Sequence, residues 1–360
     1  MGKLTQAVNL AAFAAGRCRP LTGPVKVIWE VTYKCNSRCK HCHLWQVKEH
    51  NDLTTDEAKT FISDIKKMGA LHLSFSGGEP FLRPDMLELM TYASELGLTT
   101  GVNTNGSRLG TPEAARAACK TGLGTVYISL DGADAEMHNG LRGTPKAFDS
   151  ALLAIDNLIA QREGGTPRVF INTTVTRNNI ESLDRILDLA RQHGVDGMTM
   201  SMIQEVNKYS PEAEASMGGV RIDDLSKRLN ELAKRSDGII PHSKEYLDNF
   251  STYLQDPGEL YKYRCVAGYA TALVHPDGEV HPCPVAFCKM GNLREKSFAD
   301  IWFSPEADKV RHRVQANQHP ICWFDCVAPM NVLLHDLRKM KISHLLHKKT
   351  LAHILHKMPR

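Results

Sequence analysis

The sequence of 360 residues predicts an α/β protein whose parallel strands form a barrel or partial barrel, followed by a small cysteine-rich region. From about Val27 to Arg235, a short apolar run alternates six times with a capped helical pattern, which is typical of βα units in a parallel sheet. After about Ile240 the alternation stops, and proline, glycine and cysteine become frequent. Six consecutive βα units favour a barrel over an open nucleotide-binding sheet, although periodicity alone does not choose between them.

The first three units carry clear signals at their helix ends. The first helix is expected to begin at the capping box Thr54-Thr55-Asp56-Glu57 and to end at Gly69. The second begins at Pro84 and ends at Gly97, and the third begins at Thr111-Pro112, where proline suits the first helical turn. The strands before these helices are expected at residues 27–31, 71–75 and 99–103.

The remaining elements follow the same order. Strands are expected at residues 125–130, 169–175 and 197–203, with a helix starting near Pro145, one ending at Gly194 and one starting at Asp223. Residues 270–274 and 279–281 flank Pro276-Asp277-Gly278, which predicts a hairpin. We therefore expect four parts: an N-terminal segment (1–24), a core domain (25–240), a small domain held by a metal rather than by a large core (241–331), and a basic tail (332–360).

The composition excludes several classes of protein. With 42% hydrophobic and 23% charged residues the chain is not expected to be disordered. No stretch approaches the roughly 20 apolar residues of a membrane span, and residues 11–15 are too short for a signal peptide. We therefore expect a cytoplasmic protein, in which ten cysteines bind metals or catalyse rather than pair.

The formal charge of +4 belongs to the C-terminal tail. From Leu333 onward the chain has seven basic residues and one acidic residue. Residues 340–358 also place apolar side chains at helix-like intervals, so this helix can lie on an anionic membrane surface, bind an acidic partner, or pack on the barrel. Nucleic acid is not an expected partner, because the tail has no aromatic residues that stack on bases.

The first group of cysteines follows the first strand with the spacing C-x3-C-x2-C. Its members are Cys35, Cys39 and Cys42. Three thiolates are one ligand short of a closed zinc site or a fully ligated four-iron cluster. Zinc could recruit His41 or His43, whereas an iron–sulfur cluster would keep one iron open for substrate or cofactor. The spacing alone leaves both alternatives open.

The next strand decides between them, because it ends in Gly77-Gly78-Glu79-Pro80. Two glycines permit a close backbone approach, and a carboxylate before a rigid proline can accept from an ammonium group. Together with the three cysteines, this motif resembles the radical S-adenosylmethionine (radical SAM) superfamily over about Val27 to Ile203. The resemblance implies a partial (β/α)6 TIM-like barrel, a [4Fe-4S] cluster on Cys35, Cys39 and Cys42, and S-adenosylmethionine on its open iron.

The resemblance also implies an activity and further cofactor contacts. Reduction of the cluster, by a protein such as flavodoxin or ferredoxin, would cleave S-adenosylmethionine to a 5′-deoxyadenosyl radical that abstracts hydrogen from a substrate. His41 stands where the family usually has tyrosine or phenylalanine, and it can still stack near adenine. Asn105 is a weaker candidate, because Asn-Gly is also an ordinary turn. The implied cofactor contacts are His41, Gly77, Gly78, Glu79, Pro80, Asn105, Ser129 and Arg142.

The second group of cysteines resembles the SPASM or twitch extension, which carries auxiliary iron–sulfur clusters. A full SPASM domain has seven cysteines, and this chain has five. They suffice for one auxiliary [4Fe-4S] cluster, with zinc as the alternative and Cys288 as an alternative ligand or a spare. The cluster would relay an electron or help close the substrate cavity. Its expected ligands are Cys265, Cys283, Cys322 and Cys326.

We therefore expect a radical SAM enzyme that acts on a peptide or on a cofactor precursor such as a tetrapyrrole. A lipid is the alternative substrate, and an electron-transfer iron–sulfur protein or a zinc-organised binding module are the alternatives of other classes. Sulfatase-maturing relatives have an aspartate base after the cysteine that ends the hairpin, and Pro284 in this position disfavours that activity. No catalytic residue beyond the cluster can be assigned, and His275 and His281 are expected at a turn or rim.

Overall fold

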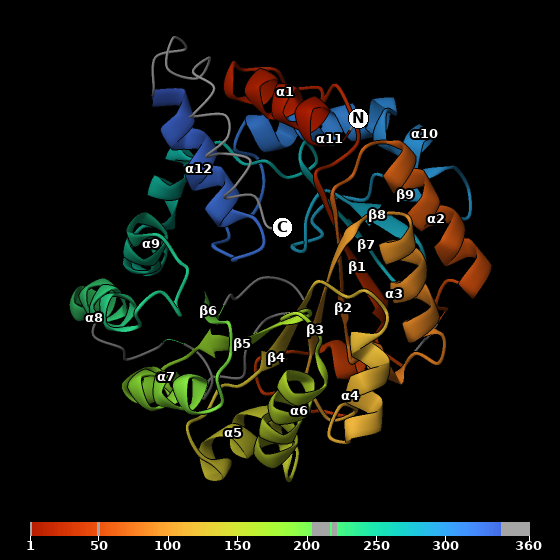
Figure 1. Ribbon diagram of the computed structural model, residues 1–360. Coiled ribbons are helices and arrows are strands. Elements are labelled where there is room, and N and C mark those ends of the chain that lie inside the picture. Colours follow the sequence, from red (N-terminus) through yellow and green to blue (C-terminus); the bar gives the residue numbers. More distant parts are fainter. Residues whose placement is uncertain (1, 49–50, 204–216, 218–221, 340–360) are drawn as a thin grey trace.

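The structure is a computed structural model that describes residues 2–48, 51–203, 217 and 222–339. Six parallel strands follow one another in chain order, and each pairs with the next. They are β1 (Lys26–Thr32), β2 (His72–Gly77), β3 (Thr99–Thr104), β4 (Thr125–Ser129), β5 (Arg168–Val175) and β6 (Gly197–Met202). Among the described strands β6 does not pair with β1, so the curved row of strands in Figure 1 is a partial barrel, as predicted.

Helices cover the outside of this row of strands (Figure 1). They are α2 (Thr55–Lys67), α3 (Met86–Glu95), α4 (Pro112–Cys119), α5 (Ala135–Arg142), α6 (Ala147–Gln161), α7 (Leu183–Gln192) and α8 (Ile222–Arg235). The predicted capping box is confirmed, because Glu57 N donates to the Thr54 hydroxyl and the Glu57 carboxylate accepts from Thr54 N. Helix α5 was not predicted; it begins at the Asp134 cap and ends at Gly143, whose φ is 58°.

Successive side chains of each strand point to opposite faces. In β1, Val27 and Trp29 face the outer helices and are fully buried, whereas Lys26 and Glu30 line the inside of the barrel. The other strands repeat this division between an apolar outer face and an inner wall with many polar groups. The barrel therefore encloses a cavity whose wall carries polar as well as apolar side chains, and not a closely packed apolar core.

The C-terminal region extends the same sheet. Strand β7 (Thr271–Val274) pairs in parallel with β1, β8 (Glu279–His281) pairs antiparallel with β7, and β9 (Gly291–Asn292) follows. The predicted hairpin is confirmed, and the sheet has nine strands in the order β6-β5-β4-β3-β2-β1-β7-β8-β9. The region also shares the main apolar core, because Phe298 of α10 (Phe298–Trp302) packs on Phe61 with ring centroids 5.8 Å apart. Its folding therefore does not depend on a metal alone.

The remaining helices gather around this region. They are α1 (Gly2–Ala14), α9 (Lys244–Gln255), α11 (Pro305–Gln315) and α12 (Ala328–Lys339). Helix α1 contacts α12 on the upper side of the molecule in Figure 1. Within the described ranges, each helix is too short or too polar to span a lipid bilayer. The basic tail from residue 340 onward lies outside the described residues.

Candidate functional site

A cavity of about 450 Å³ lies inside the partial barrel. Ligand pockets in proteins commonly enclose roughly 300 to 1,000 Å³. All six barrel strands contribute to its wall, and Pro284, Phe324, Asp325 and Cys326 reach it from the C-terminal region. One cavity therefore contacts both groups of cysteines that the sequence singles out.

The first cysteine group lines this cavity beside the carboxyl end of β1. Cys35, Cys39 and Cys42 all contribute to the wall, and all ten cysteines of the chain are free thiols. The loop is tied to α5, because Arg38 N donates to the carbonyl of Arg142 at 3.0 Å. Burial raises the pKa of the Cys35 thiol to about 12 and that of Cys42 to about 11. A metal bound by these thiols would therefore displace protons at neutral pH.

The donors of this loop suit an iron–sulfur cluster. Three buried or half-buried thiols line one cavity, and the imidazole of His41 lines it too, with a buried Nδ1 that has no partner in the described part of the chain. His43, the other ligand considered for zinc, does not line the cavity. Across the described ranges, no three His, Cys, Asp or Glu side chains converge as a single metal ion requires. A four-iron cluster does not need that convergence, because each cysteine binds a different iron.

The glycine pair packs its backbone directly on the cysteine loop. Gly77 has φ +114°, and a Cβ there would lie 2.5 Å from the carbonyl oxygen of Thr32. A Cβ on Gly78 would lie 2.3 Å from the carbonyl oxygen of Lys34. Only glycine fits at such distances. Both glycines line the cavity, so a ligand there can approach the backbone closely.

Glu79 has a different position from the one expected. It is fully buried, and neither it nor Pro80 lines the cavity. Its carboxylate accepts hydrogen bonds from Phe81 N at 3.1 Å, the Thr104 hydroxyl at 2.7 Å and Asn105 N at 2.8 Å. The expectation that Glu79 faces an ammonium group of a cofactor is therefore not met, because these bonds turn its carboxylate to the end of β3.

Asn105 does reach the cavity, and it braces the cysteine loop. Its side-chain amide donates to Asn36 Oδ1 at 2.8 Å and to Ser37 Oγ at 3.1 Å. Ser129, at the end of β4, lines the same wall. The structure thus brings both polar residues to the cavity, as expected from their positions at strand ends.

Arg142 lies against the first cysteine group and has a buried partner that the sequence analysis missed. Its Nη2 is 2.6 Å from Asp131 Oδ2, and its Nη1 is 3.8 Å from Cys39 Sγ. Although burial alone would raise it, the Arg142 guanidinium holds the pKa of Asp131 below its usual range. Asp131 stands two residues after Ser129, so its place at a strand end was the available signal. Nearby, burial lowers the pKa of His41 to about 4, which keeps that imidazole neutral.

The four predicted auxiliary cysteines lie together in a second apolar cluster, around residues such as Val266 and Tyr269. Burial raises the pKa of each thiol, and their mutual repulsion adds to the shift: Cys265 raises that of Cys283, and both raise that of Cys322. Cys326 is the member of the four that also lines the cavity. The members of this site are Cys265, Cys283, Cys322 and Cys326.

Cys288 lies apart from these four. It packs on the main core rather than in the second cluster, and its Sγ accepts from Arg313 Nη1 at 2.9 Å. This placement favours Cys288 as a spare thiol over Cys288 as a ligand of the auxiliary site.

His275 and His281 were expected at a turn or rim. His275 does open the hairpin turn, because its carbonyl accepts from Gly278 N at 3.0 Å, but neither histidine is exposed at a rim. Both His275 and His281 are buried, and their rings lie 4.5 Å apart. His275 Nδ1 is 2.7 Å from the carboxylate of Glu30 and 2.8 Å from the hydroxyl of Tyr33. The pairing of β7 with β1 explains this, because it brings the residue after β7 beside the carboxyl end of β1.

Two protein families match parts of this chain. The family described as "Radical SAM superfamily" matches residues 29–190, and the family described as "Iron-sulfur cluster-binding domain" (SPASM) matches residues 265–327. The AdoMet-dependent heme synthase of Methanosarcina barkeri is 31% identical over 300 residues, which are 79% of this chain and 83% of that protein. Mycofactocin maturase of Mycobacterium tuberculosis is 31% identical over 294 residues, 79% of this chain and 71% of that protein.

Solved structures share the fold. SuiB of Streptococcus suis bound to the precursor peptide SuiA has a TM-score of 0.66 at 19% identity, covering 86% of this chain and 71% of that one. The structure of anSMEcpe with bound AdoMet has a TM-score of 0.61 at 14% identity, covering 92% and 99%. At identities this low, the similarity to these structures shows a shared fold and no more.

Proposed function

The chain belongs to the radical SAM superfamily and carries its SPASM extension, and from this premise we propose that its cavity binds S-adenosylmethionine and a peptide or tetrapyrrole substrate. Membership makes the protein an enzyme with a [4Fe-4S] cluster and S-adenosylmethionine, and the SPASM region adds auxiliary iron–sulfur binding. Together these groups supply a 5′-deoxyadenosyl radical that abstracts hydrogen from the substrate. The observation that carries the proposal is the single cavity lined by Cys35, Gly78, Arg142 and Cys326.

The residues at the carboxyl end of the strands would bind the cofactors. Cys35, Cys39 and Cys42 would hold the first cluster, and the backbone at Gly77 and Gly78 leaves room for the methionine part of S-adenosylmethionine. These five residues all line the cavity, as do His41, Asn105, Ser129 and Arg142.

Two of those neighbours suit particular parts of S-adenosylmethionine. The guanidinium of Arg142 is suited to a carboxylate, and its Nε is buried without a partner in the described residues. The neutral imidazole of His41 offers a flat surface for adenine.

The auxiliary site would lie at the other side of the substrate. Cys265, Cys283, Cys322 and Cys326 provide the four thiols that one [4Fe-4S] cluster needs. Since Cys326 lines the cavity, an electron could pass between this site and the substrate. Pro284 occupies the cavity wall where a base would follow Cys283, which supports a reaction other than sulfatase maturation.

The choice of a peptide or a tetrapyrrole rests on the relatives. Similar proteins are named as a mycofactocin maturase, an AdoMet-dependent heme synthase and an Fe-coproporphyrin III synthase. SuiB, which shares the fold, was solved with a precursor peptide. A lipid substrate has only the basic tail in its favour.

The test is anaerobic reconstitution with iron and sulfide, followed by iron counting and an assay for 5′-deoxyadenosine with dithionite. We expect about eight irons per chain, for two clusters, and formation of 5′-deoxyadenosine. Cys39→Ala should abolish this product, whereas Cys326→Ala should keep some of it without substrate turnover. Fewer than about four irons, or no 5′-deoxyadenosine in the unsubstituted enzyme, would contradict the proposal, and equal loss in both variants would contradict separate sites.

A radical SAM enzyme requires a reductant, and we propose a flavodoxin or a ferredoxin for this one. Both carriers transfer one electron at a time, and reduction of a [4Fe-4S] cluster requires one electron, which supports the proposal. Replacing dithionite by reduced flavodoxin or ferredoxin in the assay should support 5′-deoxyadenosine formation.

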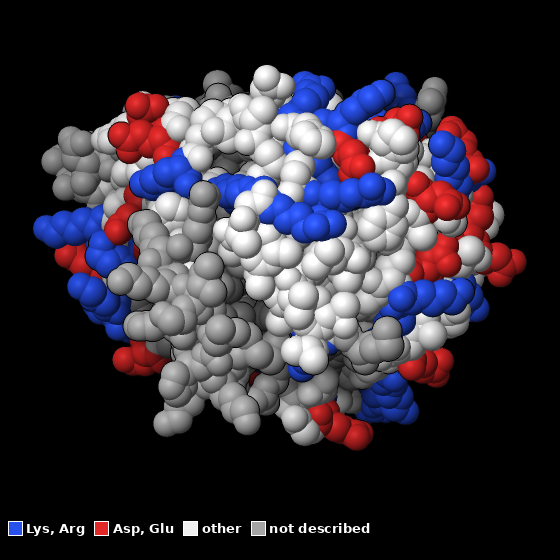
Figure 2. Space-filling model, turned by 90° about the horizontal axis from the view of Figure 1, so that it is seen from above, with Lys and Arg blue, Asp and Glu red and all other residues white. Residues whose placement is uncertain are grey.

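We also propose a peripheral contact of the basic tail with anionic membrane. It is supported by the surface near α1 and α12, the last described helix, where Figure 2 shows Lys and Arg side chains, and where α1 exposes Leu4 (67%) and Val8 (54%). Vesicles of phosphatidylglycerol should retain the protein in flotation and those of phosphatidylcholine should not. Leu4→Ser with Val8→Ser should weaken retention, whereas Leu153→Ser on α6, also exposed, should not; equal retention by both lipids would refute the contact.

A further inference from the structure

We propose that Lys26 anchors a carboxylate of the substrate at the end of the cavity that adjoins the auxiliary cysteines. The inference rests on the proposed function and adds a chemical requirement to it, because the substrate must then carry a carboxylate at a set distance from the reacting atom. A peptide and a tetrapyrrole can both supply such a group.

The position of Lys26 separates it from the S-adenosylmethionine end of the cavity. Lys26 is the first residue of β1, in register with His72 of β2 and Thr271 of β7, and its side chain lines the cavity. The first cysteine group follows the other end of the same strand. Seven residues of strand span roughly 20 Å, so a substrate held by Lys26 would extend along β1 toward the cofactor.

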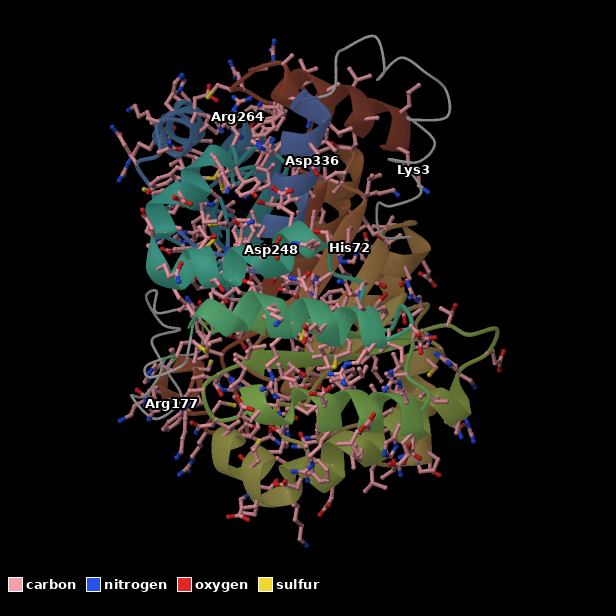
Figure 3. All side chains as sticks on the ribbon, turned by 90° about the vertical axis from the view of Figure 1, so that its left-hand side faces the viewer. Lys3, His72, Arg177, Asp248, Arg264 and Asp336 are labelled. Atoms are coloured by element: carbon pink, nitrogen blue, oxygen red, sulfur yellow. The ribbon has the colours of Figure 1, made fainter. Side chains whose placement is uncertain are left out.

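Lys26 is also close to the auxiliary site. Burial lowers the pKa of His72 and raises that of Cys326, and the positive charge of Lys26 adds to the first shift and opposes the second. His72 lines the same cavity, and its label lies near the middle of the view in Figure 3. Lys26, His72 and Cys326 thus line the same cavity, and the charge of Lys26 acts on both of the other side chains.

The ammonium of Lys26 has no anionic partner of its own in the described part of the chain. No Asp or Glu oxygen of those residues lies within 4 Å of it, and no hydrogen bond of its Nζ is formed there. Among the described residues that line the cavity, the other lysine or arginine is Arg142, which is paired with Asp131. His72 adds no charge, because burial lowers its pKa to about 3. The unneutralised positive charge of this wall is thus at Lys26.

Asp325 adds a negative charge to the cavity wall. Its carboxylate raises the pKa of Tyr127, after the larger effect of burial, whereas Lys26 lowers the pKa of His72, also after burial. A substrate carboxylate in the cavity is therefore attracted by Lys26 and repelled by Asp325.

The anchor would contribute substantially to binding. An ammonium enclosed in a cavity loses much of its hydration, and a carboxylate that enters the cavity restores the lost interaction. Hydrogen bonds to charged groups contribute about 1.5 to 3 kcal/mol. Removing the ammonium should therefore weaken binding of a carboxylate by about 10- to 100-fold.

The experiment titrates the reconstituted enzyme with Fe-coproporphyrin III, which has free carboxylates, and with its methyl ester, followed by the absorption of the porphyrin. Lys26→Met should weaken binding of the acid by at least about 10-fold and leave the ester unchanged, and Lys26→Arg should restore most of the affinity. Lys67→Met, whose side chain is 77% exposed on α2, is the matched control. Equal losses for acid and ester, or no loss for the acid, would overturn the anchor.

A second arm identifies the source of the carboxylate. N-acetylglycyl-phenylalanine and its C-terminal amide are compared in lysine acetylation followed by mass spectrometry, with Lys67 as the internal reference. Protection of Lys26 by the peptide acid and not by the amide supports a peptide carboxylate, and protection by the porphyrin acid alone supports a tetrapyrrole. If neither acid protects Lys26, the inference is wrong.

The same preparations separate this inference from the proposed function. If the unsubstituted enzyme forms no 5′-deoxyadenosine, the proposed function fails; if it does so while acid and ester bind equally, only the anchor fails. Asp325→Asn should leave acid binding equal or stronger, since it removes a negative charge. If Lys26→Met lost iron and bound the ester less well too, Lys26 would serve the auxiliary site, and the anchor would be refuted.

Discussion

At the scale of single residues, the site depends on charges that are buried and paired. Asp131 is fully buried and Arg142 nearly so, and their contact at 2.6 Å holds the guanidinium beside Cys39. A buried ion is expensive to leave without its partner. This pair therefore fixes the position of Arg142 before any ligand arrives.

Asp131→Asn tests this role. The variant leaves Arg142 buried without its counter-ion, so the free energy of unfolding should fall by about 3 to 5 kcal/mol, measured by urea denaturation of the iron-free protein. Asp188→Asn is the control, because Asp188 is 71% exposed beside Arg191 and should change stability by less than about 0.5 kcal/mol. Similar losses in the two variants would show that burial of the pair has no special importance.

The residues of the site differ in how well the sequence alone predicts their positions. The place of the three cysteines and the two glycines in the cavity wall could be predicted, since the two motifs together at consecutive strand ends resemble those of one family. The direction of Glu79 could not be predicted, because hydrogen bonds from β3 turn its carboxylate away from the cavity. Lys26 had no signal at all, because one lysine at the start of a strand becomes informative only when its surroundings are known.

At the scale of elements, the start of α2 joins the barrel to the C-terminal region. The Glu57 carboxylate that closes the capping box also accepts from Arg294 Nε at 2.9 Å, in the loop after β9. The hydrogen bond from Arg294, together with the backbone of Thr54, lowers the pKa of Glu57 to about 2. The same carboxylate thus completes a helix cap and a contact between distant segments.

This contact predicts a pH dependence of stability. The pKa of Glu57 is lower in the folded chain than the value of about 4.3 in the unfolded chain, so its carboxylate stabilises the fold above that value. The contribution is lost as the pH falls from about 4.3 towards 2. Glu57→Gln should therefore lower the free energy of unfolding by about 1 kcal/mol at pH 7, with little difference from the natural chain near pH 2.

Urea denaturation at several pH values measures this effect. Glu113→Gln, in the first turn of α4, is the control, because the N-cap of that helix is formed by Thr111 and Ala114 N without it. A difference for Glu57→Gln that stays constant down to pH 2 would contradict the pairing with Arg294.

The elements themselves were predicted with uneven success. The six strands and most of their helices have long alternating patterns and strong caps, so their places were evident. Helix α5 has only eight residues between β4 and α6, which is too short for a clear periodic pattern. It nevertheless matters for the site, because its last residue is Arg142.

At the scale of the whole molecule, β1 joins the two regions. Its register with β2 on one side and β7 on the other makes one sheet of nine strands. The alternation of the sequence predicts the barrel and the hairpin separately, but pairing between residues about 245 positions apart leaves no local pattern. The closeness of His275 to Glu30, and of Cys326 to the barrel cavity, follows from this pairing and could not be predicted.

The central place of β1 also limits how the chain can be divided. If the C-terminal region were removed, β1 would become an edge strand whose backbone N–H and C=O groups have no partner on the side of β7. It is rich in β-branched and aromatic residues, including Val27, Trp29 and Val31, and such an edge readily pairs with another chain. A barrel expressed alone would therefore aggregate, and the two regions can be exchanged between proteins only together with the strand that they share.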